Sequence, residues 1–184
     1  QTCALSLFEG TLTVDQNVNL NDSTDAYNTI EKSLIGITNN AVISGSLANQ
    51  VAIADNFSSV NSVTYNNMIN NGTVSLTGDG SVAIYANNGN ITNSSAVSAT
   101  GKESFGIYGE NGTVSTNTGT ITIGDQGVGI YGVSYQDPSN PGANGGGLIN
   151  ITNSGSITGT GGSGTIGIYS NTNRTGGTKG DAVV

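Results

Sequence analysis

The phrase Val128-Gly129-Ile130-Tyr131 recurs along this chain of 184 residues, with small changes, as Val82-Ala83-Ile84-Tyr85, Phe105-Gly106-Ile107-Tyr108 and Ile166-Gly167-Ile168-Tyr169. The first three tyrosines are spaced by 108 − 85 = 23 and 131 − 108 = 23 residues. The fourth follows after 169 − 131 = 38 residues, which is 23 plus 15. A fixed period of roughly 20–50 residues is typical of solenoids, in which each repeat stacks on its neighbour. The spacing therefore predicts a repeat array.

The residues between these phrases alternate in polarity, as in Thr73-Val74-Ser75-Leu76 and Thr120-Ile121-Thr122-Ile123. Such alternation predicts half-buried strands, and the Gly, Asn and Asp residues between them are turn formers. No part of the repeat has the helical period of about 3.6 residues. A coil of about 23 residues made of strands and turns is the size of one rung of a parallel β-helix. We therefore expect an all-β parallel β-helix of about seven rungs, which is a rod of about 35 Å.

Strand alternation also assigns faces within the phrase. It places Val128 and Ile130 on one face of the strand, and Gly129 and Tyr131 on the other. We assign the branched pair to the interior, where each buried isoleucine is worth roughly 1.5–3 kcal/mol. The predicted core column is Ile84, Ile107, Ile130 and Ile168, and the tyrosines form a second column on the outer face or at a strand end.

Two further positions repeat in step with the tyrosines. An apolar residue precedes each tyrosine at nearly the same interval, at Met68, Ile91, Val114 and Ile151. Two positions later stand Asn70, Asn93, Thr116 and Asn153. Stacked asparagines can bond amide to amide, so Asn70 and Asn93 predict a turn ladder.

We divide the chain into an irregular N-terminal segment, residues 1–34, and a β-solenoid over residues 35–184. Solenoid ends are usually atypical because something must cover the open core, so the first segment is a candidate cap. Both prolines fall in the Gly-rich stretch 132–147, which we expect to leave the solenoid as a loop because proline cannot donate to a β-ladder. A second loop, which holds the surplus of the preceding repeat, is expected at 56–65.

Composition excludes several classes of function. The formal net charge is −8, and the only basic residues are Lys32, Lys102, Arg174 and Lys179, which are too few to neutralise the phosphates of a nucleic acid. No run approaches the roughly 18 apolar residues of a membrane span, so we expect no membrane insertion by this segment. The chain begins without an initiator Met and carries no signal peptide, which suggests a piece of an exported protein.

The residues that usually perform catalysis are scarce. The chain has no histidine, which removes His-based triads and His metal sites. Asp79 and Asp125 follow equivalent turn glycines, but Lys102 occupies the position between them, so no acidic pair forms. The Gly-rich stretch from Gly176 is one imperfect copy of a calcium-binding repeat that needs tandem copies, and a Gly-rich turn is favoured. We predict no catalytic residues, no metal ligands and no cofactor.

Two features remain as candidate sites. An exposed column of Tyr85, Tyr108, Tyr131 and Tyr169 could stack on sugar rings or bury at a contact with another protein. The alternative, which we favour, is stacking along the sheet for stability. Cys3 is the only cysteine, so it is either a partner for an intermolecular disulfide or a thiol tolerated near a terminus, and the second is favoured.

Three kinds of phrase together resemble a known family: Gly106-Ile107-Tyr108-Gly109, Asn153-Ser154-Gly155-Ser156-Ile157-Thr158-Gly159 and Asn70-Asn71-Gly72-Thr73-Val74-Ser75. Over residues 35–184 the chain resembles passenger regions of autotransporter adhesins of Gram-negative bacteria. The resemblance implies a secreted β-helical rod displayed on the outer cell surface and used for attachment. The C-terminal membrane barrel of such proteins is not part of this sequence, so the chain would be a segment of one.

The leading hypothesis is therefore a non-enzymatic surface adhesin or stalk, whose partner is a host or bacterial surface protein or glycan. An alternative is a self-assembling subunit of an extracellular fibre, since open rungs at a solenoid end can template stacking of further copies. A remote alternative is a β-helical polysaccharide-processing enzyme, which would need a clustered acidic pair.

Overall fold

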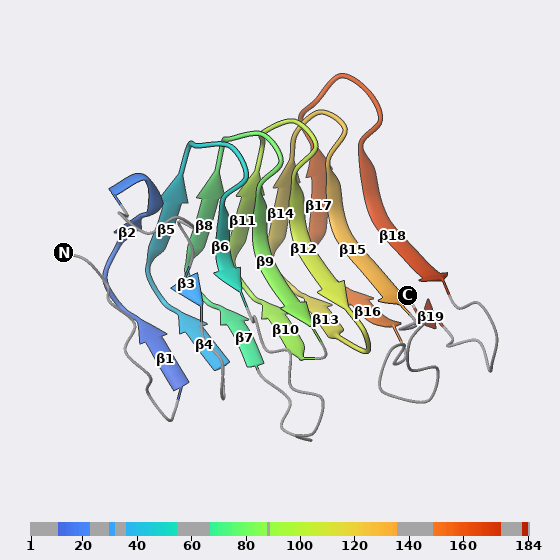
Figure 1. Cartoon of the computed structure of the whole chain (residues 1–184), viewed down its shortest axis with the longest axis horizontal. Coiled ribbons are helices and arrows are strands. Elements are labelled where there is room, and N and C mark those ends of the chain that lie inside the picture. Colours follow the sequence, from blue (N-terminus) through green and yellow to red (C-terminus); the bar gives the residue numbers. More distant parts are fainter. Residues whose placement is uncertain are drawn as a thin grey trace.

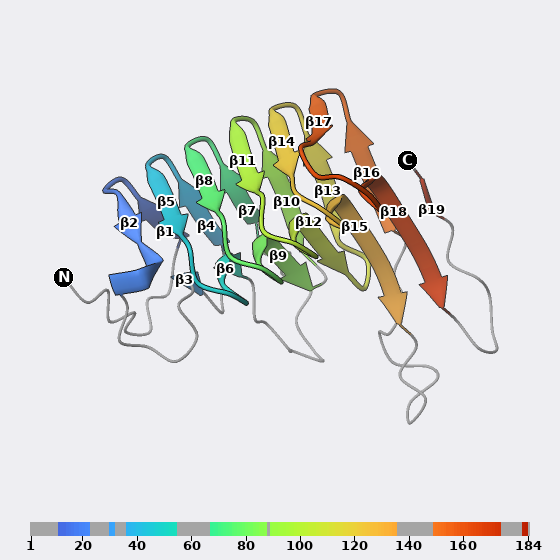
Figure 2. The same cartoon turned by 90° about the horizontal axis from the view of Figure 1, so that it is seen from above.

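The chain forms a solenoid of short parallel strands arranged in three sheets (Figure 1). The structure is a computed structural model that describes residues 11–22, 30–31, 36–54, 67–87, 89–135, 149–173 and 182–183. The chain visits the first, second and third sheets in turn, so three consecutive strands make one rung. Figure 2 shows the rungs following one another from the N-terminal to the C-terminal side. The prediction of a parallel β-helix is confirmed.

The sheets contain seven, six and six strands. The first sheet consists of β1 (Thr11–Val14), β4 (Gly36–Asn39), β7 (Asn67–Asn70), β10 (Asn90–Asn93), β13 (Val114–Asn117), β16 (Ile149–Asn153) and β19 (Ala182–Val183). The second consists of β2 (Val18–Asn19), β5 (Val42–Gly45), β8 (Thr73–Leu76), β11 (Ala96–Ala99), β14 (Thr120–Ile123) and β17 (Ser156–Gly159). The third consists of β3 (Ile30–Glu31), β6 (Val51–Ala54), β9 (Val82–Asn87), β12 (Phe105–Glu110), β15 (Val128–Tyr135) and β18 (Ile166–Asn173). The described residues thus make six full rungs and the first strand of a seventh.

The solenoid begins earlier than the sequence analysis placed it. Strands β1, β2 and β3 all lie within residues 1–34 and pair in parallel with β4, β5 and β6. A 3₁₀ turn, η1 (Leu20–Asp22), follows β2 and buries Leu20 in the core at 2% exposure. The boundary at residue 34 is therefore wrong, since this segment contains a complete rung. Of the candidate cap, residues 1–10, 23–29 and 32–34 lie outside the described part.

The register of strand pairing shows where extra residues are inserted between rungs, and two such insertions were expected, at 56–65 and at 132–147. Between the second and third rungs the paired positions differ by 67 − 36 = 31 in the first sheet, 73 − 42 = 31 in the second and 82 − 51 = 31 in the third. The surplus over the period, 31 − 23 = 8, therefore falls between Ala54 and Asn67, and the loop expected at 56–65 lies in this interval, outside the described residues. Strand β15 continues to Tyr135, so the excursion expected at 132–147 does not begin at Gly132. Residues 136–148 lie outside the described part.

The interior is filled by stacked aliphatic columns. Ile84, Ile107 and Ile130 are fully buried, and Ile168 is partly buried against the same core, so the predicted isoleucine column is confirmed. A second column belongs to the first sheet and contains Ile37, Met68, Ile91, Ser115 and Ile151.

The predicted place of Val114 in that second column is wrong. Val114 pairs with Asn90 and Asn150, and its neighbour Ser115 takes the buried position beside Ile91. The turn before β13 is one position longer than the turn before β10, because Glu110 pairs with Asn87 at an offset of 110 − 87 = 23 while Val114 pairs with Asn90 at an offset of 114 − 90 = 24.

An asparagine ladder runs along the turn between the first and second sheets. Each side-chain amide donates from Nδ2 to Oδ1 of the next rung, at 2.8, 2.8, 2.7 and 2.7 Å, through Asn39, Asn70, Asn93, Asn117 and Asn153. The predicted ladder is confirmed and is longer than expected. Asn117, and not Thr116, takes the fourth position, because the longer turn before β13 shifts this rung by one position.

Candidate functional site

The four tyrosines of the repeated phrase come together on the third sheet. Tyr85 pairs with Tyr108, Tyr108 with Tyr131, and Tyr131 with Tyr169 in consecutive strands. The position below Tyr85 in β6 is Ala54, so the column begins at the third rung. The predicted column therefore exists, and main-chain pairing fixes its spacing.

The rings of this column pack on one another. Ring centroids are 5.7 Å apart for Tyr85 and Tyr108, 4.7 Å for Tyr108 and Tyr131, and 5.1 Å for Tyr131 and Tyr169. The last pair is stacked with 5° between its planes, whereas the first two are tilted by 47° and 39°. Only Tyr131 and Tyr169 turn their ring faces fully toward each other, and the close packing of the column leaves mainly ring edges accessible before Tyr169.

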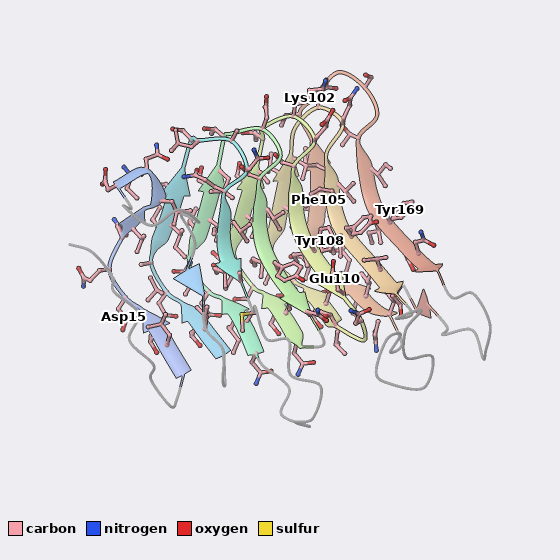
Figure 3. The ribbon with its side chains drawn as sticks, in the orientation of Figure 1. Asp15, Lys102, Phe105, Tyr108, Glu110 and Tyr169 are labelled. Atoms are coloured by element: carbon pink, nitrogen blue, oxygen red, sulfur yellow. The ribbon has the colours of Figure 1, made fainter. Side chains whose placement is uncertain are left out.

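A second apolar column lies beside the tyrosines, and it corrects the predicted faces. The ring of Phe105 packs edge-on against Tyr108 at 5.2 Å and against Tyr131 at 5.4 Å, so Phe105 shares the tyrosine face (Figure 3). The equivalent positions in the adjacent strands are Val82, Val128 and Ile166.

Simple alternation fails here because two consecutive residues of the phrase turn inward. Gly106 and Ile107 are both buried between the half-buried Phe105 and Tyr108. Val128 is buried at 8% exposure, but it pairs with Phe105 and lies outside the core cluster that contains Ile130, so the prediction that both residues point into the core column holds for Ile130 alone. We define the aromatic face as Val82, Tyr85, Phe105, Tyr108, Val128, Tyr131, Ile166 and Tyr169.

Glu110 borders the aromatic face, and sequence reasoning missed it. The hydroxyl of Tyr85 donates to Glu110 Oε2 at 3.0 Å, across adjacent rungs. Glu110 pairs with Asn87 and Val133 in the ladder. Its position two residues after a column tyrosine on a strand was the available signal, since residues i and i+2 share a face.

The accessible part of the aromatic face is at its C-terminal end. Ile166 is 40% exposed and Tyr169 is 38% exposed, while the other three tyrosines and Phe105 are half-buried. This end of the aromatic face therefore offers apolar area beside the hydroxyl group of a tyrosine.

The acidic turn residues Asp79 and Asp125 accept hydrogen bonds from main-chain N–H groups of the next rung. Asp79 Oδ1 accepts from the main-chain N–H of Lys102 at 2.8 Å, and Asp125 Oδ1 accepts from that of Ser163 at 2.9 Å. Lys102 Nζ lies 3.6 Å from Glu103 Oε1 in an exposed pair. The described residues contain no group of three or more His, Cys, Asp or Glu side chains that could hold a metal ion.

Other sequence candidates fall outside the structure's description. Cys3 and the Gly-rich stretch 176–181 lie among residues that are not described. Within the described residues, no helix is long and apolar enough to cross a membrane.

No family model, no curated protein and no solved structure matches this chain. Its function must therefore be argued from its own residues.

Proposed function

We propose that this chain is a non-enzymatic extracellular β-solenoid that acts as a surface adhesin or stalk of the autotransporter-passenger type. The observation that carries the proposal is the continuous stacking of six rungs, with the buried asparagine ladder along one turn and the aromatic face along one sheet. A rod that contacts only its neighbouring rungs can hold a binding face away from its anchor with a short length of chain.

The chemistry of the side chains supports an extracellular, non-catalytic role. Most outward positions carry short neutral side chains, and only 9% of all residues are charged. Asp79 and Asp125, the acidic residues of two equivalent turns, are each bonded to a main-chain N–H. We place the protein on the outer surface of a Gram-negative bacterium, or secreted from one, on the strength of the resemblance given above.

We further propose that the aromatic face contacts a protein on a host or bacterial surface. Sugars usually stack on ring faces, and in this column each ring packs closely on its neighbour, face to face for Tyr131 and Tyr169 and tilted for the other two pairs. Edges and hydroxyl groups, with Phe105 between them and Glu110 alongside, suit a protein partner better than a glycan.

An adherence assay tests this proposal. Beads coated with the purified chain are applied to epithelial cells and to bacterial cells, and bound beads are counted. A variant in which Tyr85, Tyr108, Tyr131 and Tyr169 are changed to Thr keeps strand propensity and removes the rings, so its adherence should fall to that of uncoated beads.

The matched control changes the outward column of the second sheet. Ser75→Ala, Ser98→Ala, Thr122→Val and Thr158→Val alter the same number of side chains on the same rungs and should leave adherence unchanged. Equal loss in both variants, or no adherence by the parent chain, contradicts the proposal. Filaments in electron micrographs of the parent chain would favour the fibre-subunit alternative instead.

A further inference from the structure

We propose that Tyr131 and Tyr169 form a site of oxidative cross-linking, where a one-electron oxidant joins the two rings into a dityrosine that ties β15 to β18. Their rings lie within 5° of parallel, with centroids 5.1 Å apart. The two residues are also direct partners in the β15–β18 ladder, which holds both rings at a fixed separation. This inference is independent of the adhesive role proposed above.

The other pairs of the column are less suited to coupling. Tyr108 and Tyr131 have closer centroids, at 4.7 Å, but their planes are tilted by 39° and Phe105 makes a T-shaped contact with both. Tyr85 and Tyr108 are 5.7 Å apart and tilted by 47°. Tyr169 is the most exposed ring of the four, so a soluble oxidant reaches it first.

The chemistry needs an oxidant from outside the chain, and hydrogen peroxide with a haem peroxidase is the class we name. The enzyme removes one electron and one proton from each phenol. The two phenoxyl radicals join by a carbon–carbon bond between positions ortho to the oxygens, and the hydrogen on each of those carbons moves to the oxygen. Two tyrosines and one peroxide thus give one dityrosine and two waters. Coupling within one chain outpaces coupling between chains, because the rings are already in place.

The bond would act as a staple between rungs. It closes a loop of the chain between residues 131 and 169, which includes the inserted segment 136–148. A covalent closure of this kind restricts the unfolded chain in the way a disulfide does. We therefore expect the oxidised protein to unfold at a higher temperature than the untreated one.

The test uses a background variant in which Tyr27, Tyr65 and Tyr135 are changed to Phe, so that only the column retains phenols. The protein is treated at low concentration with peroxide and a haem peroxidase, digested, and mapped by mass spectrometry. We expect one main product, in a monomeric chain, that links the peptides containing Tyr131 and Tyr169 with the loss of two hydrogen atoms.

Two single variants in that background make the result specific. Tyr169→Phe keeps the ring and removes one phenol of the pair, so dityrosine fluorescence and the cross-linked peptide should be lost. Tyr85→Phe is the matched control at the other end of the column and should retain both. The inference is overturned if the main cross-link joins another pair, if it forms only between chains, or if Tyr169→Phe leaves it in place.

Discussion

One turn position shows that the solenoid accepts non-glycine residues where the backbone has the left-handed conformation that favours glycine. In the turn between the second and third sheets, Gly80 and Gly164 have φ of 66° and 72°, and the non-glycine residues Asn49, Glu103 and Gln126 adopt φ between 55° and 59°. For an L-residue this left-handed conformation costs about 1–2 kcal/mol. The turn is thus imposed by the neighbouring rungs, since it persists where its own sequence opposes it.

We therefore predict that Glu103→Gly is more stable than Glu103→Ala by about 1 kcal/mol. Both variants remove the same exposed ion pair with Lys102, so their difference isolates the backbone conformation. Urea unfolding followed by circular dichroism measures it. Equal midpoints for the two variants would show that the left-handed turn carries no strain.

The buried amide ladder makes a second prediction at this scale. Asn93 is fully buried, accepts from Asn70 and donates to Asn117. Asn93→Ala removes the partner of the Asn70 amide donor and of the Asn117 acceptor, together with two bonds to the main chain of Ser95, and we expect a loss of about 2–4 kcal/mol in the free energy of unfolding. Asn153→Ala is the matched control at the exposed end of the ladder, where water can replace the lost bond, and it should cost less than about 1 kcal/mol. Similar losses for both variants would contradict a role for burial.

At the scale of the strand, the third sheet contains a glycine position where the room for a side chain depends on the atoms of the next rung. A Cβ added at Gly129 in β15 would lie 2.5 Å from Gly167 O and 2.5 Å from Ile157 Cγ2. A Cβ added at the equivalent Gly167 in β18 meets no atom within 4 Å. Gly129→Ala should therefore destabilise the protein by about 1–3 kcal/mol, as overpacking does, while Gly167→Ala stays close to the parent.

Thermal unfolding of Gly129→Ala and Gly167→Ala, side by side with the parent, measures this difference. The position holds Ala52 and Ala83 in the earlier rungs, so alanine is compatible with the strand itself. A stable Gly129→Ala would mean that β17 and β18 shift to admit the methyl group.

The strand scale also shows what the sequence could and could not predict. The isoleucine column, the tyrosine column and the ladder pair Asn70–Asn93 follow from spacing alone. Between the fourth and fifth rungs, the paired tyrosines of the third sheet differ by 131 − 108 = 23 positions. In the first and second sheets, the paired residues of the same two rungs differ by 114 − 90 = 24 and 120 − 96 = 24 positions. A longer turn before β13 is compensated by a shorter one before β15. A period measured on one sheet therefore misplaced Val114 and Thr116 in another.

The side on which Phe105 lies escaped prediction for a different reason. Two neighbouring residues, Gly106 and Ile107, both face the core, and strict alternation has no place for such a pair. Glu110 was missed because its partner, the Tyr85 hydroxyl, comes from the rung before it. Contacts between rungs depend on the register of strand pairing. The amino-acid sequence reveals this register only where the repeat is regular.

At the scale of the whole molecule, rungs should be removable as units. Stability in a solenoid is approximately a sum over repeats and the interfaces between neighbours. Deleting residues 90–113 removes one full rung, and it lets Val114 take the place of Asn90 beside Asn67. We expect a shorter rod that still folds cooperatively, with a lower midpoint of unfolding.

The control deletion removes residues 90–101, which is half a rung. It would bring a strand of the third sheet into the first and should abolish folding. Far-ultraviolet circular dichroism and small-angle X-ray scattering distinguish the two outcomes. Loss of folding in both deletions would show that the six rungs form one indivisible unit.

The asparagine ladder has a consequence for the rod as a physical object. Every amide in it donates in the same sense, from Asn39 toward Asn153, so the row of dipoles adds along the axis and each bond polarises the next. Main-chain groups alternate in direction along parallel strands and impose no such sense. The rod is therefore polar along its axis: the amide donors of this row all point toward its C-terminal side, and the first rung, which has Val14 at this position, precedes the row.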